Sequence, residues 1–123
     1  MTKVSIISVV DDDQSVRESL HGLLRSVGFS VQIFSSAEEF LSSDDLNKTD
    51  CLILDVRMPG ITGIELQRRL RALGCQIPII FISAHADEET RNQALSGGAV
   101  AFLLKPLNEE MVLTALKTAL NDG

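Results

Sequence analysis

The sequence predicts an α/β fold, a doubly wound (β/α)₅ arrangement in which a five-stranded parallel sheet carries helices on both faces. Five short runs rich in β-branched residues alternate along the chain with stretches whose apolar residues recur at helical spacing. Several of these runs are apolar throughout, as strands buried on both faces are. A length of 123 residues suits one core, so residues 1–123 are expected to form a single domain.

The predicted strands and helices follow one another in regular order. The strands are expected at residues 4–10, 31–34, 51–54, 79–82 and 101–104. The first helix has an apolar stripe, and Gly28 then ends it; the stripe consists of Val16, Leu20, Leu23, Leu24 and Val27. The second helix, up to Leu41, opens at Ser36 with Glu39 three residues later, which is a capping box.

Three further helices complete the alternation. The stripe of the third is Leu66, Leu70 and Leu73, closed by Gly74. The fourth, over residues 87–96, has Leu95 as its only large apolar residue, supported by Ala94, so we expect it to be weakly held. The fifth is capped by Asn108, and its predicted core face is Val112, Leu113, Leu116 and Leu120.

Composition and charge argue against several classes of function. A net charge of −6 repels phosphate backbones, and a chain without Trp or Tyr offers few rings for base stacking, so no direct nucleic-acid binding is expected. Cys51 and Cys75 match neither a zinc spacing nor a disulfide framework and are expected to be reduced thiols in a cytoplasmic protein. No stretch resembles a membrane span or a signal peptide, so no membrane association is expected.

Polar side chains stand at the ends of four predicted strands. Each has an ordinary structural explanation, such as capping a helix, starting a turn or pairing with a nearby charge. Because the carboxyl ends of parallel strands share one edge of the sheet, where such folds bind ligands, we expect these residues to line one pocket. They are Asp11, Asp12 and Asp13 after the first strand, Asp55 after the third, Ser83 after the fourth and Lys105 after the fifth.

This set of side chains predicts a particular chemistry. Adjacent carboxylates repel one another unless a cation joins them, and oxygen-only ligands at an exposed edge suit Mg²⁺ (or Mn²⁺). No His or Cys lies at these strand ends, which argues against zinc. A carboxylate beside such a cation is able to attack a phosphoryl group, whose oxygens a Lys and a hydroxyl then hold. The residues therefore predict an acyl-phosphate site on an aspartate.

The sequence carries four motifs in this order: Val10-Asp11-Asp12 with Arg17, LILDVRMPG over residues 52–60, Ile82-Ser83-Ala84, and Phe102-Leu103-Leu104-Lys105-Pro106. Together they resemble the receiver domain of bacterial two-component response regulators. The resemblance covers essentially the whole chain, and the stretches DDDQSVRESL, SAEEFL and DVRMPGITGIEL are most similar to the FixJ-type (NarL/FixJ, LuxR-output) regulators. It implies a flavodoxin-like, CheY-like sheet of strand order 2-1-3-4-5. It also implies a longer regulator, with this domain at the N-terminal end and a helix-turn-helix output domain after it.

The resemblance implies which residues accept the phosphoryl group and bind the metal. Asp55 would be the phosphoacceptor and would also contact Mg²⁺. Asp12 would ligate the ion directly, Asp11 mainly through water, and the backbone carbonyl of Arg57 would be a further ligand. Asp13 stays open as an alternative second metal carboxylate, although the register of the motif favours Asp11 and Asp12.

The resemblance also implies how the domain would switch. Lys105 would pair with the phosphoryl group, and its bond to Pro106 would be a cis peptide, which is essentially a proline phenomenon. Ser83 would donate a hydrogen bond to a phosphoryl oxygen and move toward it. Phe102 would be the switch aromatic, turning inward as Ser83 moves.

The implied function is Mg²⁺-dependent acceptance of a phosphoryl group on Asp55 from a sensor histidine kinase or a small acyl phosphate. The domain would catalyse its own phosphorylation and dephosphorylation, and the modification would drive homodimerisation or release a DNA-binding output domain that regulates transcription. Alternatives are a stand-alone phosphorelay receiver, a receiver that signals without phosphate, and a small phosphatase with an aspartate nucleophile. Such phosphatases usually carry a second acid where Arg57 stands. A flavodoxin-like cofactor binder is disfavoured because three Asp residues occupy the place of its phosphate loop.

Overall fold

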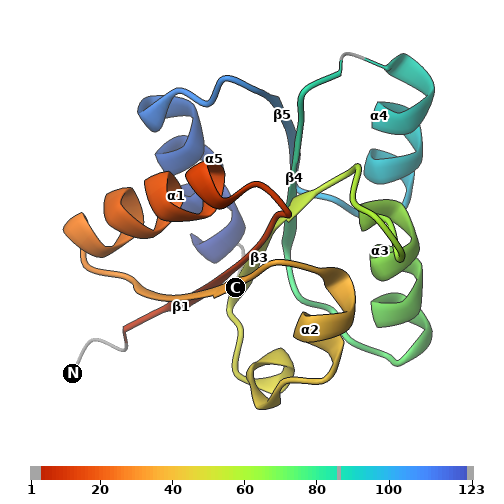
Figure 1. Cartoon of the computed structure of the whole chain (residues 1–123), viewed down its shortest axis with the longest axis horizontal. Coiled ribbons are helices and arrows are strands. Elements are labelled where there is room, and N and C mark those ends of the chain that lie inside the picture. The colour runs from red at the N-terminus through yellow and green to blue at the C-terminus, as the bar shows by residue number, and fades with distance from the viewer. Residues whose placement is uncertain (1–3, 86, 122–123) are drawn as a thin grey trace.

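The computed structural model describes residues 4–85 and 87–121, in which a parallel sheet alternates with helices (Figure 1). The elements are β1 (Ile6–Val10), α1 (Gln14–Ser26), β2 (Ser30–Phe34), α2 (Ala37–Leu41), the 3₁₀ helix η1 (Asp44–Asn47), β3 (Cys51–Asp55), α3 (Gly63–Ala72), β4 (Ile79–Ser83), α4 (Glu88–Ser96), β5 (Ala101–Leu104) and α5 (Glu109–Asn121). The strand order is β2-β1-β3-β4-β5, and all neighbours are parallel. The predicted α/β fold and its strand order are therefore confirmed.

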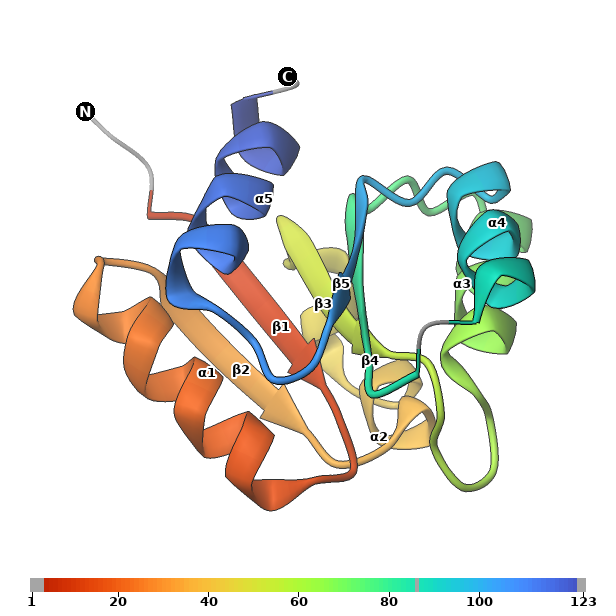
Figure 2. The ribbon, with the colours of Figure 1, turned by 90° about the horizontal axis from the view of Figure 1, so that it is seen from above.

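Helices cover both faces of the sheet, and each face has its own core. Figure 2 shows α1 and α5 on one side of the strands and α2, α3 and α4 on the other. Along β3, Cys51 and Ile53 belong to the core under α1 and α5, whereas Leu52 and Leu54 belong to the core under the other three helices. Because successive side chains enter opposite cores, the strand is apolar throughout.

Four strands differ by one or two residues from their predicted bounds. β1 begins at Ile6 rather than residue 4, and β2 begins at Ser30. The other two differences concern the site. Asp55 is the last residue of β3, paired with Ile82, and Ser83 is the last residue of β4. The side chains of Asp55 and Ser83 are thus held by regular sheet pairing rather than by the loops that follow.

Two helices end one residue earlier than their apolar stripes suggest. Val27 and Leu73 are the C-cap residues of α1 and α3, and they are 48 % and 69 % exposed. Their predicted place in the core is wrong because the chain turns away at the cap. Gly28 and Gly74 follow with φ of 100° and 77°, in the left-handed region that favours glycine, which confirms them as helix-ending residues.

The buried faces of α4 and α5 are built from smaller residues than predicted. In α5, Ala115 and Ala119 are buried with Val112 and Leu116, while the predicted Leu113 and Leu120 are half-buried. In α4, Ala94 is fully buried and Leu95 is 39 % exposed, so the only large apolar residue of this helix lies mostly outside the core. Adjacent helical residues point about 100° apart, and the inward direction belongs to Ala94.

The short elements need local hydrogen bonds to form. Ser36 caps α2 by accepting a bond from the Glu39 N–H at 3.1 Å, as predicted, whereas η1 was not predicted. Within residues 4–85 and 87–121, no helix has both the length and the apolar character needed to cross a membrane.

Candidate functional site

The predicted site residues stand at the carboxyl-terminal edge of the sheet. Asp11 directly follows β1, Asp55 ends β3, Ser83 ends β4, and Lys105 directly follows β5. Four strands that are distant in sequence therefore direct polar groups to one edge of the molecule, as expected for a parallel sheet. Some of these side chains contact one another at this edge, and others have partners elsewhere.

Three carboxylates meet at this edge. Asp11, Asp12 and Asp55 each offer one oxygen atom, and these oxygens lie within 4.8 Å of one another. Asp11 is fully buried and Asp55 is 4 % exposed, while Asp12 is exposed. The expectation of an exposed set of ligands is therefore wrong for two of the three, because β1 and β3 lie in the middle of the sheet. Like charges this close, in a buried place, favour binding of a cation.

Asp13 has a different task from its two neighbours. Its Oδ1 accepts hydrogen bonds from the N–H of Ser15 at 2.9 Å and from its hydroxyl at 2.7 Å, so it is the N-cap of α1. These bonds to Ser15 lower the pKa of Asp13. Of the three consecutive aspartates, one begins the helix and the other two join the carboxylate cluster.

The carboxylate of Asp11 is held on one side and open on the other. Its Oδ1 accepts a bond from the Asp13 N–H at 2.8 Å, and Arg17 donates to the backbone carbonyl of Asp11 at 2.9 Å. Its Oδ2 is buried and accepts no hydrogen bond from residues 4–85 or 87–121, although the Lys105 ammonium lies 3.0 Å away as an ion pair. A buried oxygen without a well-aligned donor is a fit place for a cation to bind.

Lys105 bridges two strands through its ammonium group. Its Nζ lies 3.0 Å from Asp11 Oδ2 and 3.5 Å from Asp55 Oδ1. Burial alone would lower the pKa of Lys105, but bonding and attraction to Asp11 and Asp55 outweigh burial, so the pKa is raised. The Lys105-Pro106 peptide is cis, as the resemblance implied. The Lys105 ammonium thus pairs with two of the three carboxylates of the cluster.

The excess of negative charge in the carboxylate cluster makes Asp55 harder to ionise. Burial and then the negative charge of Asp11 raise the pKa of Asp55 to about 7, and Lys105 offsets only part of this. In the absence of a cation, Asp55 therefore carries its proton through the acidic pH range. A divalent ion at the cluster would favour the ionised, nucleophilic form.

Ser83, by contrast, has its hydrogen bonds in the loop that leads to α4. Its hydroxyl donates to the His85 carbonyl at 3.1 Å and accepts from the His85 N–H at 3.1 Å. Ser83 itself is 2 % exposed, whereas Ala84 and His85 are exposed. The hydroxyl would have to leave His85 to act on a group attached to Asp55.

Phe102 and Arg57 also have partners outside the carboxylate cluster. The Phe102 ring is half-buried and packs against Phe81, with ring centroids 6.4 Å apart. The Arg57 side chain is exposed, and its Nη2 lies 3.9 Å from Asp87 Oδ2, at the start of α4. The switch role of Phe102 and the metal-binding role of the Arg57 carbonyl stay predictions.

Gly63 is a residue of the site that the sequence reasoning missed. It begins α3, and its N–H donates to the carbonyl of Val56 at 2.9 Å. A Cβ at this position would lie 2.3 Å from the Asp55 carbonyl oxygen and 3.0 Å from the Val56 Cα. Only glycine lets α3 start this close to the backbone of Asp55. The second glycine of "PGITG" was the available signal, because Gly60 alone is enough for the turn.

Gly63→Ala is expected to destabilise the fold by about 1–3 kcal/mol, because the clash is with rigid backbone. Urea unfolding measures the change. Gly22→Ala is the matched control, since a Cβ at Gly22 in α1 meets nothing within 4 Å. That control should be stabilising by about 0.5–1 kcal/mol, as Ala is a better helix former. Equal effects of the two substitutions would contradict the close approach at Gly63.

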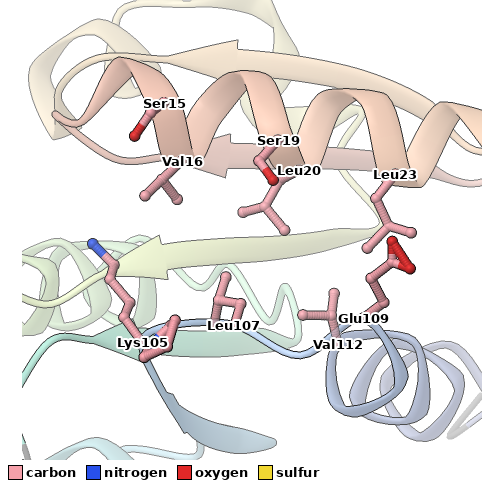
Figure 3. A pocket seen from close by; sticks show the side chains of 10 residues that line it. Ser15, Val16, Ser19, Leu20, Leu23, Lys105, Leu107, Glu109 and Val112 are labelled. Carbon is pink, nitrogen blue, oxygen red and sulfur yellow. The ribbon is translucent and has the colours of Figure 1, made fainter.

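A largely apolar groove of about 370 Å³ adjoins the site. Figure 3 shows that it lies between α1 and the segment that leads into α5, with Lys105 at one end. Val16 and Leu20 line it from α1, and Leu107 and Val112 line it from the opposite side. A partner that reaches Asp55 from this side would have apolar surface to rest on.

Comparisons with known proteins agree with this geometry. A family model described as "Response regulator receiver domain" matches residues 7–117. The response regulator protein TodT of Pseudomonas putida is 49 % identical over 118 residues, which cover 96 % of this chain and 52 % of TodT. The transcriptional regulatory protein FixJ of Bradyrhizobium diazoefficiens is 38 % identical over 123 residues, 60 % of its length. The crystal structure of FixJ-N superposes with a TM-score of 0.88 at 34 % identity, covering 99 % of this chain and 98 % of FixJ-N. The chain thus spans about half the length of TodT.

Proposed function

The chain belongs to the response regulator receiver domain family, and on this premise we propose that Asp55 accepts a phosphoryl group from the phosphohistidine of a sensor kinase or from a small acyl phosphate. The observation that carries the proposal is the contact network around Asp55. Its carboxylate ends β3 within 4.8 Å of two further carboxylates and 3.5 Å from the Lys105 ammonium. This is a nucleophile beside groups that are able to balance the charge of a phosphoryl oxygen.

In the transfer step, a carboxylate oxygen of Asp55 attacks phosphorus. The P–O bond forms as the P–N bond of the phosphohistidine breaks, and the electron pair of that bond remains on the imidazole nitrogen. With a small acyl phosphate, the bond between phosphorus and the bridging oxygen breaks instead, and the donor's carboxylate leaves with the electron pair. The product is a mixed anhydride on Asp55, and its hydrolysis by water returns the carboxylate and releases inorganic phosphate. Lys105 is placed to hold the new phosphoryl oxygens, since its ammonium already lies between Asp11 and Asp55.

The residues present fit Mg²⁺ (or Mn²⁺). Asp11, Asp12 and Asp55 are oxygen donors, and Asp11 Oδ2 is a buried oxygen without an aligned hydrogen-bond donor. These three carboxylates and the backbone carbonyl of Arg57 would hold the ion. When bound, the ion supplies positive charge that offsets the carboxylates and the incoming phosphoryl oxygens.

The switch begins at Ser83. In the unmodified protein its hydroxyl is bonded to His85, two residues before the cap of α4. A phosphoryl oxygen on Asp55 offers a charged acceptor, which competes well against a neutral carbonyl. Movement of Ser83 toward that oxygen releases the loop before α4 and leaves room for Phe102 to turn inward. Phosphate on Asp55 thereby selects a second arrangement of this face.

The output is transcription regulation by a longer regulator. TodT and FixJ exceed the length of this chain, and FixJ is described as a transcriptional regulatory protein. We assign the receiver to the N-terminal part of a cytoplasmic regulator whose helix-turn-helix domain binds DNA. The face of α4, β5 and α5 would form a homodimer on phosphorylation. Leu95, Leu104 and Met111 on that face are 39 %, 45 % and 50 % exposed, which suits such a contact.

Intact mass after incubation with acetyl phosphate and Mg²⁺ tests the proposed function. We expect a single phosphoryl adduct on the wild-type protein, none with EDTA, and none on Asp55→Asn. Asp44→Asn, which changes an exposed aspartate in η1, is the matched control and should form the adduct normally. A folded wild-type protein that forms no adduct with acetyl phosphate, with a phosphorylated kinase or with beryllofluoride would contradict the proposal.

A further inference from the structure

The C-terminal end of α4 is tied to α3 by a buried polar contact. Gln67, on α3, is 2 % exposed, and its amide Nε2 donates to the Ala94 carbonyl at 3.0 Å. The same carbonyl accepts from the Ala99 N–H at 3.1 Å. A buried amide is costly unless it is hydrogen-bonded, so the position of this pair is specified more narrowly than an apolar contact would be.

Two further residues strengthen the tie. Gly97 has an ordinary φ of −79°, yet a Cβ there would lie 2.6–2.8 Å from the Gln67 amide atoms. A side chain at position 97 would therefore displace the Gln67 amide, whereas the backbone conformation of Gly97 does not itself call for glycine. Arg71, one turn beyond Gln67, donates to the Cys75 and Ile77 carbonyls at 3.0 and 3.1 Å and reaches the Gly97 carbonyl at 3.4 Å.

The N-terminal end of α4 has weaker ties to α3. Asp87 caps α4 by accepting hydrogen bonds from the Glu89 N–H and the Thr90 hydroxyl. Its partner outside α4 is the exposed side chain of Arg57, whose Nη2 lies 3.9 Å from Asp87 Oδ2. Exposed ion pairs of this kind contribute little. A hollow of about 300 Å³ separates the first turns of α3 and α4, with Thr62 on one side and Thr90 on the other. Among the described residues, the contacts between these two helices, which lie side by side in Figures 1 and 2, are thus firmer at the C-terminal end of α4 than at its N-terminal end.

We propose that Gln67, seated against Gly97, is the hinge of α4, about which the N-terminal end of the helix swings while the C-terminal end stays in place. Ser83 and its partner His85 precede the N-terminal end of α4 in the chain, so a change at Ser83 becomes a rotation of the helix about the Gln67–Ala94 hydrogen bond. The hinge itself does not depend on phosphoryl chemistry; only the signal that moves it rests on the proposed function.

Amide hydrogen exchange on the unmodified protein tests the hinge. The N–H groups of Gly97 and Ala99 should be better protected than that of Arg91, at the other end of the helix. Gln67→Met keeps the side-chain volume but removes the donor, and it should lower protection at Gly97 and Ala99 by about tenfold relative to α1. Asn92→Leu removes an exposed amide of α4 that does not line the hollow between α3 and α4, and it should leave both ends unaltered. Uniform protection along α4, or an unchanged ratio in a folded Gln67→Met, would overturn the proposal.

A double-mutant cycle tests the contact even if Gln67→Met folds poorly. Gly97→Ala should destabilise the wild-type protein because its Cβ enters the space of the Gln67 amide. In a Gln67→Ala background that space is empty, so the same substitution should cost far less. We expect a departure from additivity of at least about threefold in the unfolding equilibrium constant. Additive effects would show that Gly97 and Gln67 do not act together, and would overturn the hinge.

The final arm uses the protein carrying beryllofluoride or phosphate on Asp55. Exchange at Glu89 and Arg91 should change by a larger factor than exchange at Gly97 and Ala99. An equal change at both ends would overturn the hinge. If no adduct forms, the failure belongs to the proposed function, because the comparison of unmodified variants stands without it.

Discussion

Asp55→Asn is expected to stabilise the metal-free protein, and this gain should be larger by about 2–3 kcal/mol at pH 8 than at pH 5. In the wild-type protein, burial and the charge of Asp11 raise the pKa of Asp55 to about 7, from an ordinary value of 3.8. The folded state therefore holds a proton that the unfolded state releases. The stability that this proton supplies is fully present below pH 3.8 and is lost as the pH rises through about 7. An asparagine has no such proton to lose.

Urea unfolding in EDTA at the two pH values measures this gain. Asp44→Asn, at an exposed position, should show the same small effect at both. Added Mg²⁺ should stabilise the wild-type protein at pH 8 and narrow its difference from Asp55→Asn. A gain that is equal at pH 5 and pH 8 would contradict a raised pKa at Asp55. If Asp55→Asn were less stable than the wild-type protein at pH 8, that result would contradict the excess of negative charge that we assign to the carboxylate cluster.

Lys105→Met is expected to slow adduct formation from acetyl phosphate by about 100-fold or more, which is typical for removal of one charge-stabilising donor at a reacting group. The lysine is the positive partner of both Asp11 and Asp55, at 3.0 and 3.5 Å. Without it, the phosphoryl oxygens lose their ammonium partner. The two buried carboxylates also lose their counter-charge, so the metal-free protein should unfold more easily at pH 8.

A time course of intact mass at fixed Mg²⁺ measures the rate of adduct formation. Lys117→Met removes an exposed lysine on α5 and should leave this rate unchanged. Urea unfolding of the same samples separates loss of chemistry from loss of fold. An unchanged rate in a folded Lys105→Met would contradict the role assigned to this residue.

The sequence predicts the edge of the sheet well, because strand ends in a parallel sheet must meet. Asp55 and Ser83 were found in this way, whereas the division of Asp11, Asp12 and Asp13 between the cap of α1 and the carboxylate cluster comes from the structure. The burial of Asp11 and Asp55 was not predicted. It depends on the strand order, which places β1 and β3 in the middle of the sheet.

Residues whose role depends on close packing escaped prediction. In the sequence Gly63 looks like an ordinary loop glycine, because nothing there indicates that the Asp55 carbonyl lies beside it. Gln67 reads as an exposed helical residue, because nothing in the periodicity tells a buried amide from a solvated one. In α4 the buried residue is Ala94 and not the larger Leu95, and side-chain size alone does not indicate this.

The sharpest test of Asp55 as the phosphoacceptor is to identify the residue that carries the phosphoryl group. Protein treated with acetyl phosphate and Mg²⁺ is reduced with borohydride, which converts an aspartyl phosphate to homoserine, and is then digested for peptide mass analysis. We expect homoserine at position 55 alone, and only when Mg²⁺ was present during the treatment with acetyl phosphate. Homoserine at position 11 or 12 in place of 55, or an adduct that borohydride leaves unchanged, would contradict Asp55 as the phosphoacceptor.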